Sequence, residues 1–192
     1  MKEHSQDAVW SSAQHNWRTP DRVLQVVRSM GSGIVLDPCT DPDNPVGAPK
    51  FYTEAEDGLS RSWHSDVGGT AAHGGLVYCN PPYGDAAKLW VAKAIEESKA
   101  GLSVILLAAS RTDVPWFHDA LAASSGVVFC KGRLRFAVAN KPAATGAPFP
   151  SVLFCLEGDA ARFGSLFVGA SAFAKLGSGI VTRPCAVWPG KR

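Results

Sequence analysis

The sequence predicts a single α/β domain with a mixed, mostly parallel sheet flanked by helices. Short apolar runs typical of buried strands alternate with segments whose apolar residues follow helical spacing. Two of these runs end in a polar side chain, Asp37 and Asn80, and open α/β sheets bind ligands at the carboxyl ends of parallel strands. At 192 residues, the chain is long enough for one domain with a sizeable core.

The composition is that of a soluble globular enzyme, with 46% hydrophobic and 19% charged residues. No apolar run reaches the ~18 residues of a membrane helix, and the N-terminus lacks the apolar core of a signal peptide. The five cysteines are odd in number and contain no Cys-x-x-Cys pair, which indicates free thiols in a reducing cytoplasm. The five histidines lack metal-ligand spacing, so no metal is expected.

The net charge of +2 is unevenly distributed along the chain. Residues 1–130 hold 10 Lys/Arg and 15 Asp/Glu, whereas residues 131–192 hold 9 Lys/Arg and 2 Asp/Glu. A basic C-terminal third favours a polyanion partner such as nucleic acid, and an ordinary solvated surface is the alternative.

The first elements follow a polar segment over residues 1–16, which is expected to be a loose arm that leaves 17–192 as the domain. Thr19 suits the N-cap of the first helix and Pro20 its first position. Ile34-Val35-Leu36-Asp37 then predicts a strand, and the Asp37 carboxylate could bind the amino group of an amino-acid-like cofactor. The apolar face of the helix would consist of Val23, Leu24, Val26 and Val27.

A second strand is expected over Lys50-Phe51-Tyr52-Thr53, followed by an acidic segment. There, Glu54 or Asp57 could bind ribose hydroxyls, or Asp57 could hold an adenine amino group. Residues 65–75 are rich in Gly, Ala and Ser and predict a flexible loop. Only 43 positions separate Asp37 from Asn80. The nucleotide-binding half should therefore be trimmed, with loops in place of one or two crossover helices.

The apolar run from Leu76 to Cys79 predicts a buried strand that stops at Asn80-Pro81-Pro82-Tyr83. The turn is stiff, because each proline restricts the residue before it. The side-chain carbonyl of Asn80 and the Asn-Pro-Pro backbone carbonyls can together accept both hydrogens of a planar amino group. Tyr83 offers a flat face for a planar ring. The turn therefore predicts a site for an exocyclic amino group, and the alternative is a proline-rich loop that only ends a strand.

Further elements are expected after this turn. Asp85 suits the cap of a helix with Leu89, Ala92 and Ile95 on one face, and either Thr112 or Asp113 should begin the next helix. In chain order, the pattern predicts a helix over 85–99, a strand over 103–108, a helix from 112 or 113, a strand over 126–130, a loop over 139–150, a strand over 151–156, a helix over 160–176 and a strand over 180–182.

Three arginines are candidates for phosphate contacts, with plain surface charge as the alternative. Arg111 follows a buried strand at the sheet edge that also carries Asn80. Arg133 and Arg135 alternate with apolar neighbours, so both should point away from the core.

The Asn80–Tyr83 turn resembles the Asn-Pro-Pro-Tyr signature of S-adenosylmethionine (AdoMet)-dependent amino methyltransferases. A longer ordered set of motifs over residues 15–157 is similar to the phage-type DNA N-6-adenine-methyltransferase (Dam) family, found in bacteriophages and prophages. The loop after Asp37 lacks the Gly-x-Gly turn of most AdoMet enzymes, and this family shares that departure. The set comprises Trp17-Arg18-Thr19-Pro20, Asp37-Pro38-Cys39, Asp57-Gly58-Leu59 with Trp63, Asn80-Pro81-Pro82-Tyr83-Gly84, Arg111-Thr112-Asp113 with Trp116-Phe117, Gly132-Arg133-Leu134-Arg135-Phe136 and Pro148-Phe149-Pro150-Ser151.

The resemblance implies a Rossmann-like AdoMet-dependent methyltransferase fold, AdoMet as methyl donor with S-adenosylhomocysteine as product, and double-stranded DNA as substrate in a bacterial cytoplasm. The target adenine would be flipped out of the duplex and methylated directly. The implied catalytic residues are Asn80, Pro81, Pro82 and Tyr83. The implied cofactor-binding residues are Trp17, Thr19, Pro20, Asp37, Pro38, Cys39, Glu54, Asp57 and Asn80.

Three alternatives stay open at this point. The first is another amino methyltransferase, acting on cytosine N-4 in DNA, guanine in RNA or glutamine in a protein. The others are a nucleic-acid-binding relative without catalysis and a structural protein with a relic fold. The recognised DNA sequence would have to be read by loops, for which residues 61–75 and 139–150 are the candidates.

Overall fold

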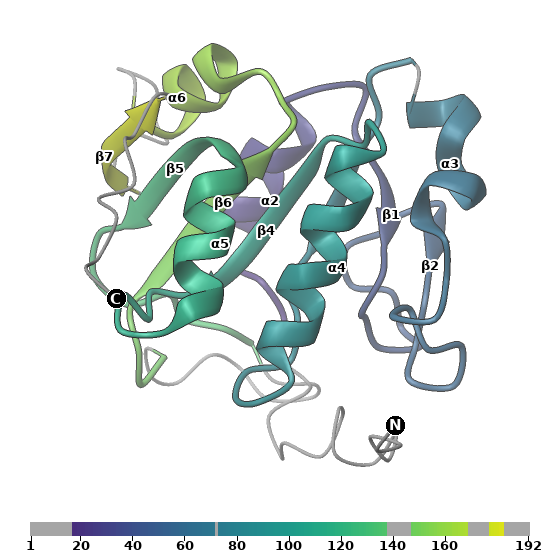
Figure 1. Cartoon of the computed structure of the whole chain (residues 1–192), viewed down its shortest axis with the longest axis horizontal. Coiled ribbons are helices and arrows are strands. Elements are labelled where there is room, and N and C mark those ends of the chain that lie inside the picture. The colour runs from purple at the N-terminus through teal and green to yellow at the C-terminus, as the bar shows by residue number, and fades with distance from the viewer. Residues whose placement is uncertain (1–16, 72, 138–146, 169–176, 183–192) are drawn as a thin grey trace, which may run out of the picture.

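The computed structural model of the protein describes residues 17–71, 73–137, 147–168 and 177–182. These residues form a seven-stranded sheet with helices on both faces (Figure 1). The strand order is β2-β1-β3-β4-β6-β5-β7. In chain order, the elements are α2 (Asp21–Arg28), β1 (Ile34–Asp37), β2 (Lys50–Phe51), α3 (Trp63–Ala71), β3 (Leu76–Cys79), α4 (Ala87–Lys99), β4 (Val104–Ala109), α5 (Pro115–Ala123), β5 (Ser124–Cys130), β6 (Ser151–Leu156), α6 (Ala160–Val168) and β7 (Gly177–Thr182).

The sheet is parallel on one side and antiparallel on the other. β1 pairs in parallel with β2 and β3, and β3 pairs in parallel with β4. β6 runs antiparallel to β4 and β5, and β7 runs antiparallel to β5. The strands β1, β3, β4 and β5 therefore end at the same edge of the sheet, where the segments that follow them can form a common site.

Each face of the sheet has its own apolar core. The helices α3, α4 and α5 cover one face, and α2 and α6 cover the other (Figure 1). Trp63, Trp90 and Phe117 are buried on the first face, and Leu24 and Phe163 on the second. Every residue of β3, β4 and β6 is buried, as expected for strands covered on both faces. This arrangement confirms the predicted α/β fold.

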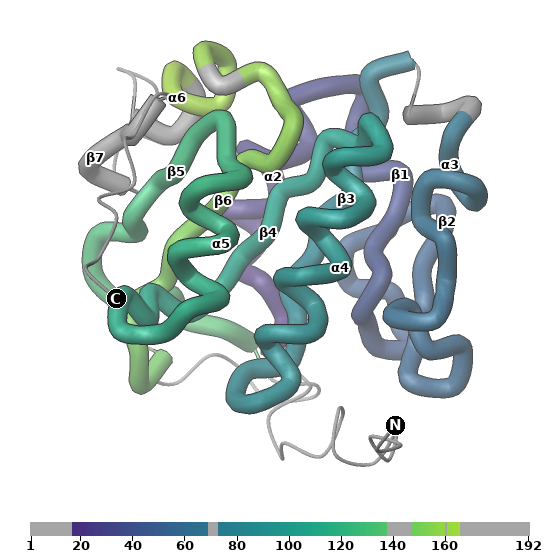
Figure 2. Tube along the Cα trace, in the orientation of Figure 1, coloured from purple at the N-terminus to yellow at the C-terminus, as the bar shows by residue number. Residues whose placement is uncertain are grey.

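The half of the sheet that contains β1 and β2 is trimmed, as predicted. Residues 38–49 connect the two strands without a helix, and α3 alone crosses over between β2 and β3 (Figure 2). β2 has two residues rather than the four expected, because β1 ends at Asp37 and leaves Tyr52 and Thr53 without a strand partner.

The prediction of a flexible loop over residues 65–75 was wrong, because most of this stretch lies in α3. Glu97 of α4 stabilises the first turn of that helix: its carboxylate accepts the N–H groups of Trp63 (3.0 Å) and His64 (2.8 Å). Trp63 is completely buried, and its Nε1 donates to the Gly58 carbonyl at 2.7 Å. Capping by the distant Glu97 and burial of Trp63 thus stabilise a helix in a segment whose composition is typical of a loop.

Two helices begin later than predicted near residues 19 and 112. α2 begins at Asp21 with Pro20 as its N-cap, and the Thr19 hydroxyl bonds to Tyr78 instead of capping the helix. α5 begins at Pro115 rather than at Thr112 or Asp113, because proline fits the first helical turn, where no N–H is needed.

α4 also begins later, at Ala87, without a side-chain cap from Asp85. It buries Trp90, Val91 and Ala94 instead of the predicted face. The predicted face is outward: Ala92 is exposed, and Leu89 and Ile95 are half-buried. Both stripes have helical spacing, and the larger side chain of Trp90 directs the helix to the sheet.

The other elements agree with the sequence where the structure describes them. All four predicted apolar residues of α2 are buried, and Leu134 and Phe136 are buried while Arg133 and Arg135 are exposed. The predicted arm over 1–16, most of the 139–150 loop and the part of the 160–176 helix after Val168 lie outside the described residues.

Candidate active site

The carboxyl ends of β1 and β3 form a topological switch point. The strands are neighbours, but the chain leads from β1 to one edge of the sheet and from β3 towards the other. Asp37 is the last residue of β1 and Asn80 follows β3, and both line the same small cavity. The Sγ atoms of Cys39 and Cys79 lie 3.7 Å apart across this point. The structure therefore brings together the two polar residues predicted at strand ends.

Asn80 is held in one orientation by hydrogen bonds at both ends of its amide. Its Nδ2 donates to the Trp17 carbonyl oxygen at 2.9 Å, and its Oδ1 accepts from the Tyr83 hydroxyl at 3.1 Å. An amide oxygen has two lone pairs. Oδ1 therefore keeps one acceptor position for a further donor.

Four rings form an aromatic cluster (Trp17, Tyr83, Phe136 and Phe149) beside the turn. Trp17 stacks on Phe136 and Phe149 with centroids 5.3 Å apart in each pair, and Tyr83 lies 4.4 Å from Phe149. A backbone bridge between Arg18 and Ala137 holds the two outer segments together. Burial raises the pKa of Tyr83 above its usual value, so its hydroxyl remains a hydrogen-bond donor.

The small cavity lies between the Trp17–Thr19 segment and the ends of β1 and β3. Asp37 is 3% exposed there, and this burial raises its pKa to about 7, against the opposing effect of a hydrogen bond from the Cys39 N–H. No cation of the described residues pairs with Asp37. A buried carboxylate without a cation is a suitable partner for an ammonium group.

Arg18 helps to close this cavity. Its guanidinium pairs with Asp41 at 3.2 Å and with Asp43 at 2.5 Å. The remaining space is about 30 Å³, enough for one or two water molecules. A larger ligand therefore requires the cavity to open, by movement of the Trp17–Thr19 segment or of the loop after β1 that also lines it.

The acidic loop after β2 packs against the loop after β1. A Cβ at Gly58 would lie 2.0 Å from the Pro38 carbonyl oxygen, so only glycine allows this approach. Asp57 is half-buried in this loop, and its carboxylate accepts the Leu59 N–H at 3.3 Å. Glu54 is exposed. The contact brings the segment of Asp57 to the end of β1, although Asp57 does not line the small cavity with Asp37.

A larger cavity of about 590 Å³ lies on the other side of the Asn80–Tyr83 turn. Pro81, Pro82 and Tyr83 line it, together with Phe149 and residues that follow β4. Asn80 lines the small cavity instead. The predicted catalytic turn thus stands between two cavities, which is the arrangement that a transfer between two bound molecules requires.

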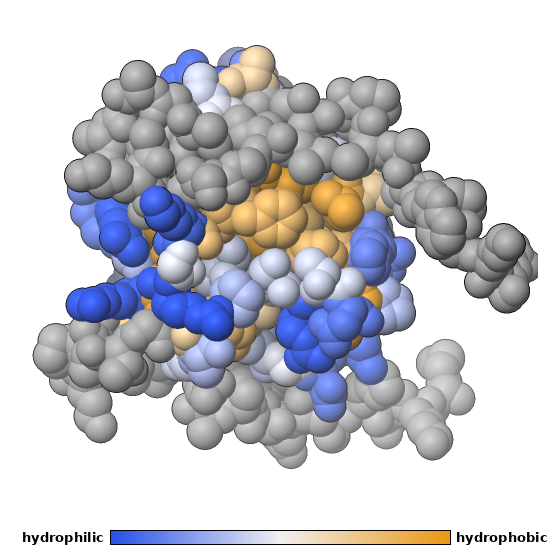
Figure 3. All heavy atoms as spheres, turned by 90° about the vertical axis from the view of Figure 1, so that its left-hand side faces the viewer, coloured by the Kyte–Doolittle hydropathy of each residue, from blue (hydrophilic) through white to orange (hydrophobic). Residues whose placement is uncertain are grey.

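The three predicted phosphate-binding arginines all follow strands that end at this edge. Arg111 lines the larger cavity and pairs with Asp113 at 3.1 and 3.2 Å. Arg133 and Arg135 are exposed after β5. Figure 3 views the molecule from the side of β5 and β7 and shows hydrophilic groups bordering an apolar area.

Several residues of the site could not be assigned from sequence reasoning. Tyr78 bonds the Thr19 hydroxyl at 2.7 Å from inside the core. Phe136 and Phe149 belong to motifs of the resembled family, and that membership was the available signal for the aromatic cluster. Trp116 and Lys88 line the larger cavity. Trp116 also belongs to a motif of the resembled family, although no role was inferred for it, and Lys88 belongs to none of these motifs.

The doubly wound sheet, the polar switch point and the Asn-Pro-Pro-Tyr turn define a Rossmann-like methyltransferase. The profile of the DNA N-6-adenine-methyltransferase (Dam) family matches residues 6–172, and the chain belongs to this family. It is a DNA (adenine-N-6) methyltransferase. A search of the curated proteins finds no match to the chain.

The residues that the structure describes lack two further features. None of their helices combines the length and hydropathy that a membrane span requires. Across the same residues, His, Cys, Asp and Glu side chains form no group of three or more that could hold a metal ion.

Proposed function

We propose that this enzyme transfers a methyl group from AdoMet directly to N-6 of an adenine flipped out of double-stranded DNA. The observation that carries the proposal is the orientation of Asn80, whose amide is hydrogen-bonded at both ends and keeps one acceptor position on Oδ1. Asn80 lines the small cavity and the next three residues line the larger one, which supports a role for the turn in bringing two substrates together.

The residues around the small cavity fit the methionine end of AdoMet. Asp37 would accept the ammonium group. The Thr19 hydroxyl, when it accepts from Tyr78, has its own proton to donate to the carboxylate, whereas the Thr40 hydroxyl already bonds Asp37. Asp57 would hold the adenosine, because its loop packs on Pro38, whereas Glu54 faces solvent. When bound, AdoMet supplies an electrophilic methyl group on a sulfonium. Cys39 lines this cavity and would contribute shape rather than charge, whereas Pro20 is the N-cap of α2 and does not line it.

Asn80 and the turn would prepare the amino group for attack. Asn80 Oδ1 accepts one N–H hydrogen and the Pro81 carbonyl accepts the other, which turns the nitrogen lone pair out of conjugation and towards the methyl group. The new N–C bond forms as the sulfonium–methyl bond breaks, and the nitrogen then releases one proton to water. No strong general base is required, because the proton leaves after the attack. The acceptors stabilise the positive charge that develops on nitrogen.

The larger cavity would receive the flipped adenine. Extrusion costs a few kcal/mol in lost stacking and pairing. A base stacked on an aromatic ring regains about 1–3 kcal/mol, for which Tyr83 is positioned by Pro81 and Pro82. Arg111, Arg133 and Arg135 would offset the remainder through phosphate contacts.

The test is methyl transfer from labelled AdoMet to unmethylated double-stranded DNA, with the modified base identified by nucleoside mass spectrometry. We expect N-6-methyladenine from the wild type and none from Asn80→Ala. Asn80→Ala should still bind AdoMet, which calorimetry can measure independently of turnover. Formation of N-4-methylcytosine instead, or full activity of Asn80→Ala, would contradict the proposal.

A further inference from the structure

We propose that Trp116 and Lys88 form a subsite for the nucleotide adjacent to the target adenine on the same DNA strand. Trp116 stacks the base of that nucleotide, and Lys88 binds its phosphate. The inference rests on the proposed function and adds to it a second nucleotide, which the Asn-Pro-Pro-Tyr turn does not contact.

The larger cavity has two walls of different character. One wall is buried and consists of the catalytic turn from Pro81 to Tyr83. On the other wall, Trp116 is half-buried and Lys88 and Arg111 are exposed. The volume of about 590 Å³ lies within the ~300–1,000 Å³ of sites that hold ligands larger than a single planar base. The outer wall is therefore available to a second group after the adenine has entered.

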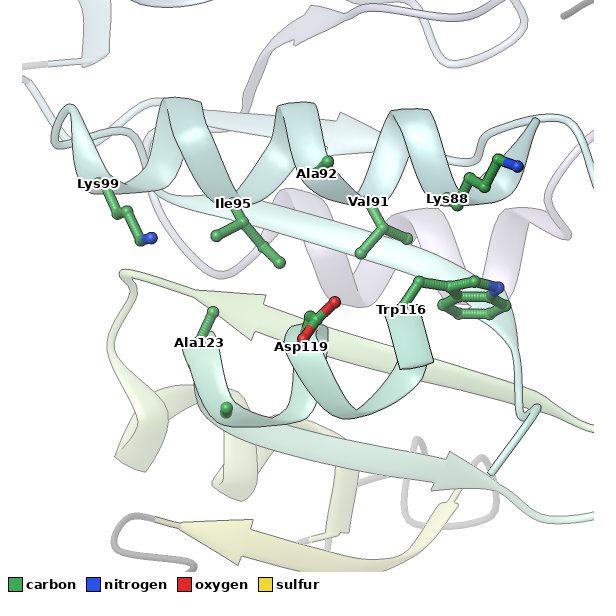
Figure 4. Close-up of a pocket in the computed structure, with 9 residues that line it drawn as sticks. Lys88, Val91, Ala92, Ile95, Lys99, Trp116, Asp119 and Ala123 are labelled. Carbon is green, nitrogen blue, oxygen red and sulfur yellow. The ribbon is translucent and has the colours of Figure 1, made fainter. Parts of the chain in front are cut away.

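Trp116 and Lys88 stand where this cavity meets a groove between α4 and α5. Both residues also line that groove, which has a volume of about 480 Å³. In Figure 4, the Trp116 indole and the Lys88 ammonium group lie at one end of the groove, and Lys99 and Ala123 lie at the other. The Lys88 end adjoins the catalytic turn, because α4 begins three residues after Gly84. An aromatic face and a cation thus occur together at the mouth of the base cavity.

The charges at this mouth are two cations, Lys88 and Arg111, and the exposed carboxylate of Asp85, which together favour one phosphate at most. Arg111 already forms two hydrogen bonds with Asp113. Lys88 is exposed, and none of the described carboxylates forms an ion pair with it. Deeper in the groove, Asp119 faces α4 between Trp116 and Ala123, which disfavours a continuous run of phosphates towards Lys99. A ligand with one flat ring and one nearby phosphate, namely a nucleotide, suits the mouth best.

Stacking on an indole requires a base but discriminates weakly between bases, since every base has a π-face. The subsite should therefore depend on the presence of a base next to the target adenine more than on its identity. This dependence would let one ring and one cation hold the strand beside the flipped base.

The decisive experiment combines variants of Trp116 with duplexes that carry one abasic residue on the 5′ or the 3′ side of the target adenine. For wild-type enzyme, the abasic residue on one of the two sides should raise KM for DNA roughly 5- to 150-fold, as a loss of 1–3 kcal/mol of stacking predicts. Trp116→Ala should raise KM for the intact duplex by a similar factor. When the abasic duplex is tested with Trp116→Ala, KM should rise little more than with either change alone.

Two substitutions separate stacking from packing. Trp116→Phe keeps a flat ring and should restore most of the affinity, whereas Trp116→Leu keeps apolar volume and should not. Lys88→Ala should flatten the salt dependence of DNA binding by about 0.9 in log–log slope, the contribution of one phosphate contact. Lys99→Ala, at the far end of the same groove, should leave the slope unchanged.

The outcomes distinguish the subsite from the proposed function. If the abasic penalty is the same in wild type and Trp116→Ala, or if Trp116→Leu has wild-type KM, the subsite is disproved while the methylation reaction stands. If wild-type enzyme forms no N-6-methyladenine on an intact duplex, the proposed function fails, and the subsite fails with it.

Discussion

The Tyr83 hydroxyl donates a hydrogen bond to the side-chain oxygen of Asn80 at 3.1 Å. The first and last residues of the Asn80–Tyr83 turn therefore hold each other in place, in addition to the restriction from the two prolines. The ring and the hydroxyl of Tyr83 serve different purposes: the ring belongs to the aromatic cluster, and the hydroxyl orients the amide of Asn80.

Replacing Tyr83 separates these two contributions. Tyr83→Phe removes one hydrogen bond worth ~0.5–1.5 kcal/mol, so kcat for DNA methylation should fall about 2- to 13-fold. Tyr83→Ala also removes the stacking face and should abolish turnover. AdoMet affinity, measured by calorimetry, should change little in either variant. Equal loss of turnover in both variants would show that the hydroxyl does more than orient Asn80.

The buried Asp37 carboxyl predicts a pH dependence of stability. Its pKa is about 7 in the folded protein, against a usual value of 3.8, because burial disfavours the charged form. The folded state therefore binds the proton more tightly, and the free energy of unfolding should decrease as pH rises from 4 to 7. At one pKa unit per 1.36 kcal/mol, the loss amounts to about 4 kcal/mol. Asp37→Asn should be more stable than wild type at pH 8 but not at pH 4, as measured by urea unfolding.

AdoMet binding provides the second readout for Asp37. If the ionised carboxylate accepts the ammonium group, wild-type affinity should decrease about tenfold per pH unit below pH 7. Asp37→Asn should bind weakly at every pH. A variant with the same pH profile as wild type would exclude this role for Asp37.

The salt dependence of DNA binding tests the exposed arginines. Arg133→Ala should weaken binding to all duplexes alike and reduce the log–log salt slope by about 0.9 if it loses one phosphate contact. Lys99→Ala is a suitable control, because Lys99 is also exposed but lies at the end of α4 remote from the Asn80–Tyr83 turn. An unchanged slope for Arg133→Ala would show that Arg133 contacts no phosphate and is ordinary surface charge.

Two buried serines on neighbouring strands allow a matched comparison of how hydroxyl groups affect the free energy of unfolding. The Ser151 hydroxyl is buried and has no hydrogen-bond partner among the described residues, whereas the Ser124 hydroxyl donates to the Ala120 carbonyl at 2.6 Å. Ser151→Ala should be neutral or slightly stabilising, and Ser124→Ala should lose about 0.5–1.5 kcal/mol of unfolding free energy. Urea unfolding compares them directly. A larger loss for Ser151→Ala would indicate a hydrogen-bond partner for this hydroxyl.

The sequence predicted those features that depend on neighbouring residues. Ile34–Asp37 and Leu76–Cys79 are apolar runs that end in polar side chains, so both the strands and the switch point could be inferred. Helix α3 could not, because its first turn is capped by Glu97, 34 residues away from Trp63. The starts of α2, α4 and α5 were misplaced by cap signals that the folded structure does not use.

In the candidate site, too, features that depend on residues distant in the sequence could not be predicted. The chemistry of Asn80 and Tyr83 follows from residue type, but the aromatic cluster joins rings from four separate segments of the chain. The predicted apolar face of α4 (Leu89, Ala92 and Ile95) is only half-buried or exposed, and Ala92 and Ile95 line the α4/α5 groove. Its outward orientation leaves the α4/α5 groove on the surface, which no local pattern indicated.

Trp17 lines the small cavity and contacts Tyr83, which lines the larger one. Its carbonyl is bound by Asn80, its ring packs against Tyr83, and its segment closes the small cavity. If AdoMet enters the small cavity and the DNA base the larger one, as proposed, a shift of Trp17 that admits AdoMet would also change its contacts with Asn80 and Tyr83. The two substrates would then bind cooperatively, and by thermodynamic reciprocity DNA would strengthen AdoMet binding by the same factor by which AdoMet strengthens DNA binding.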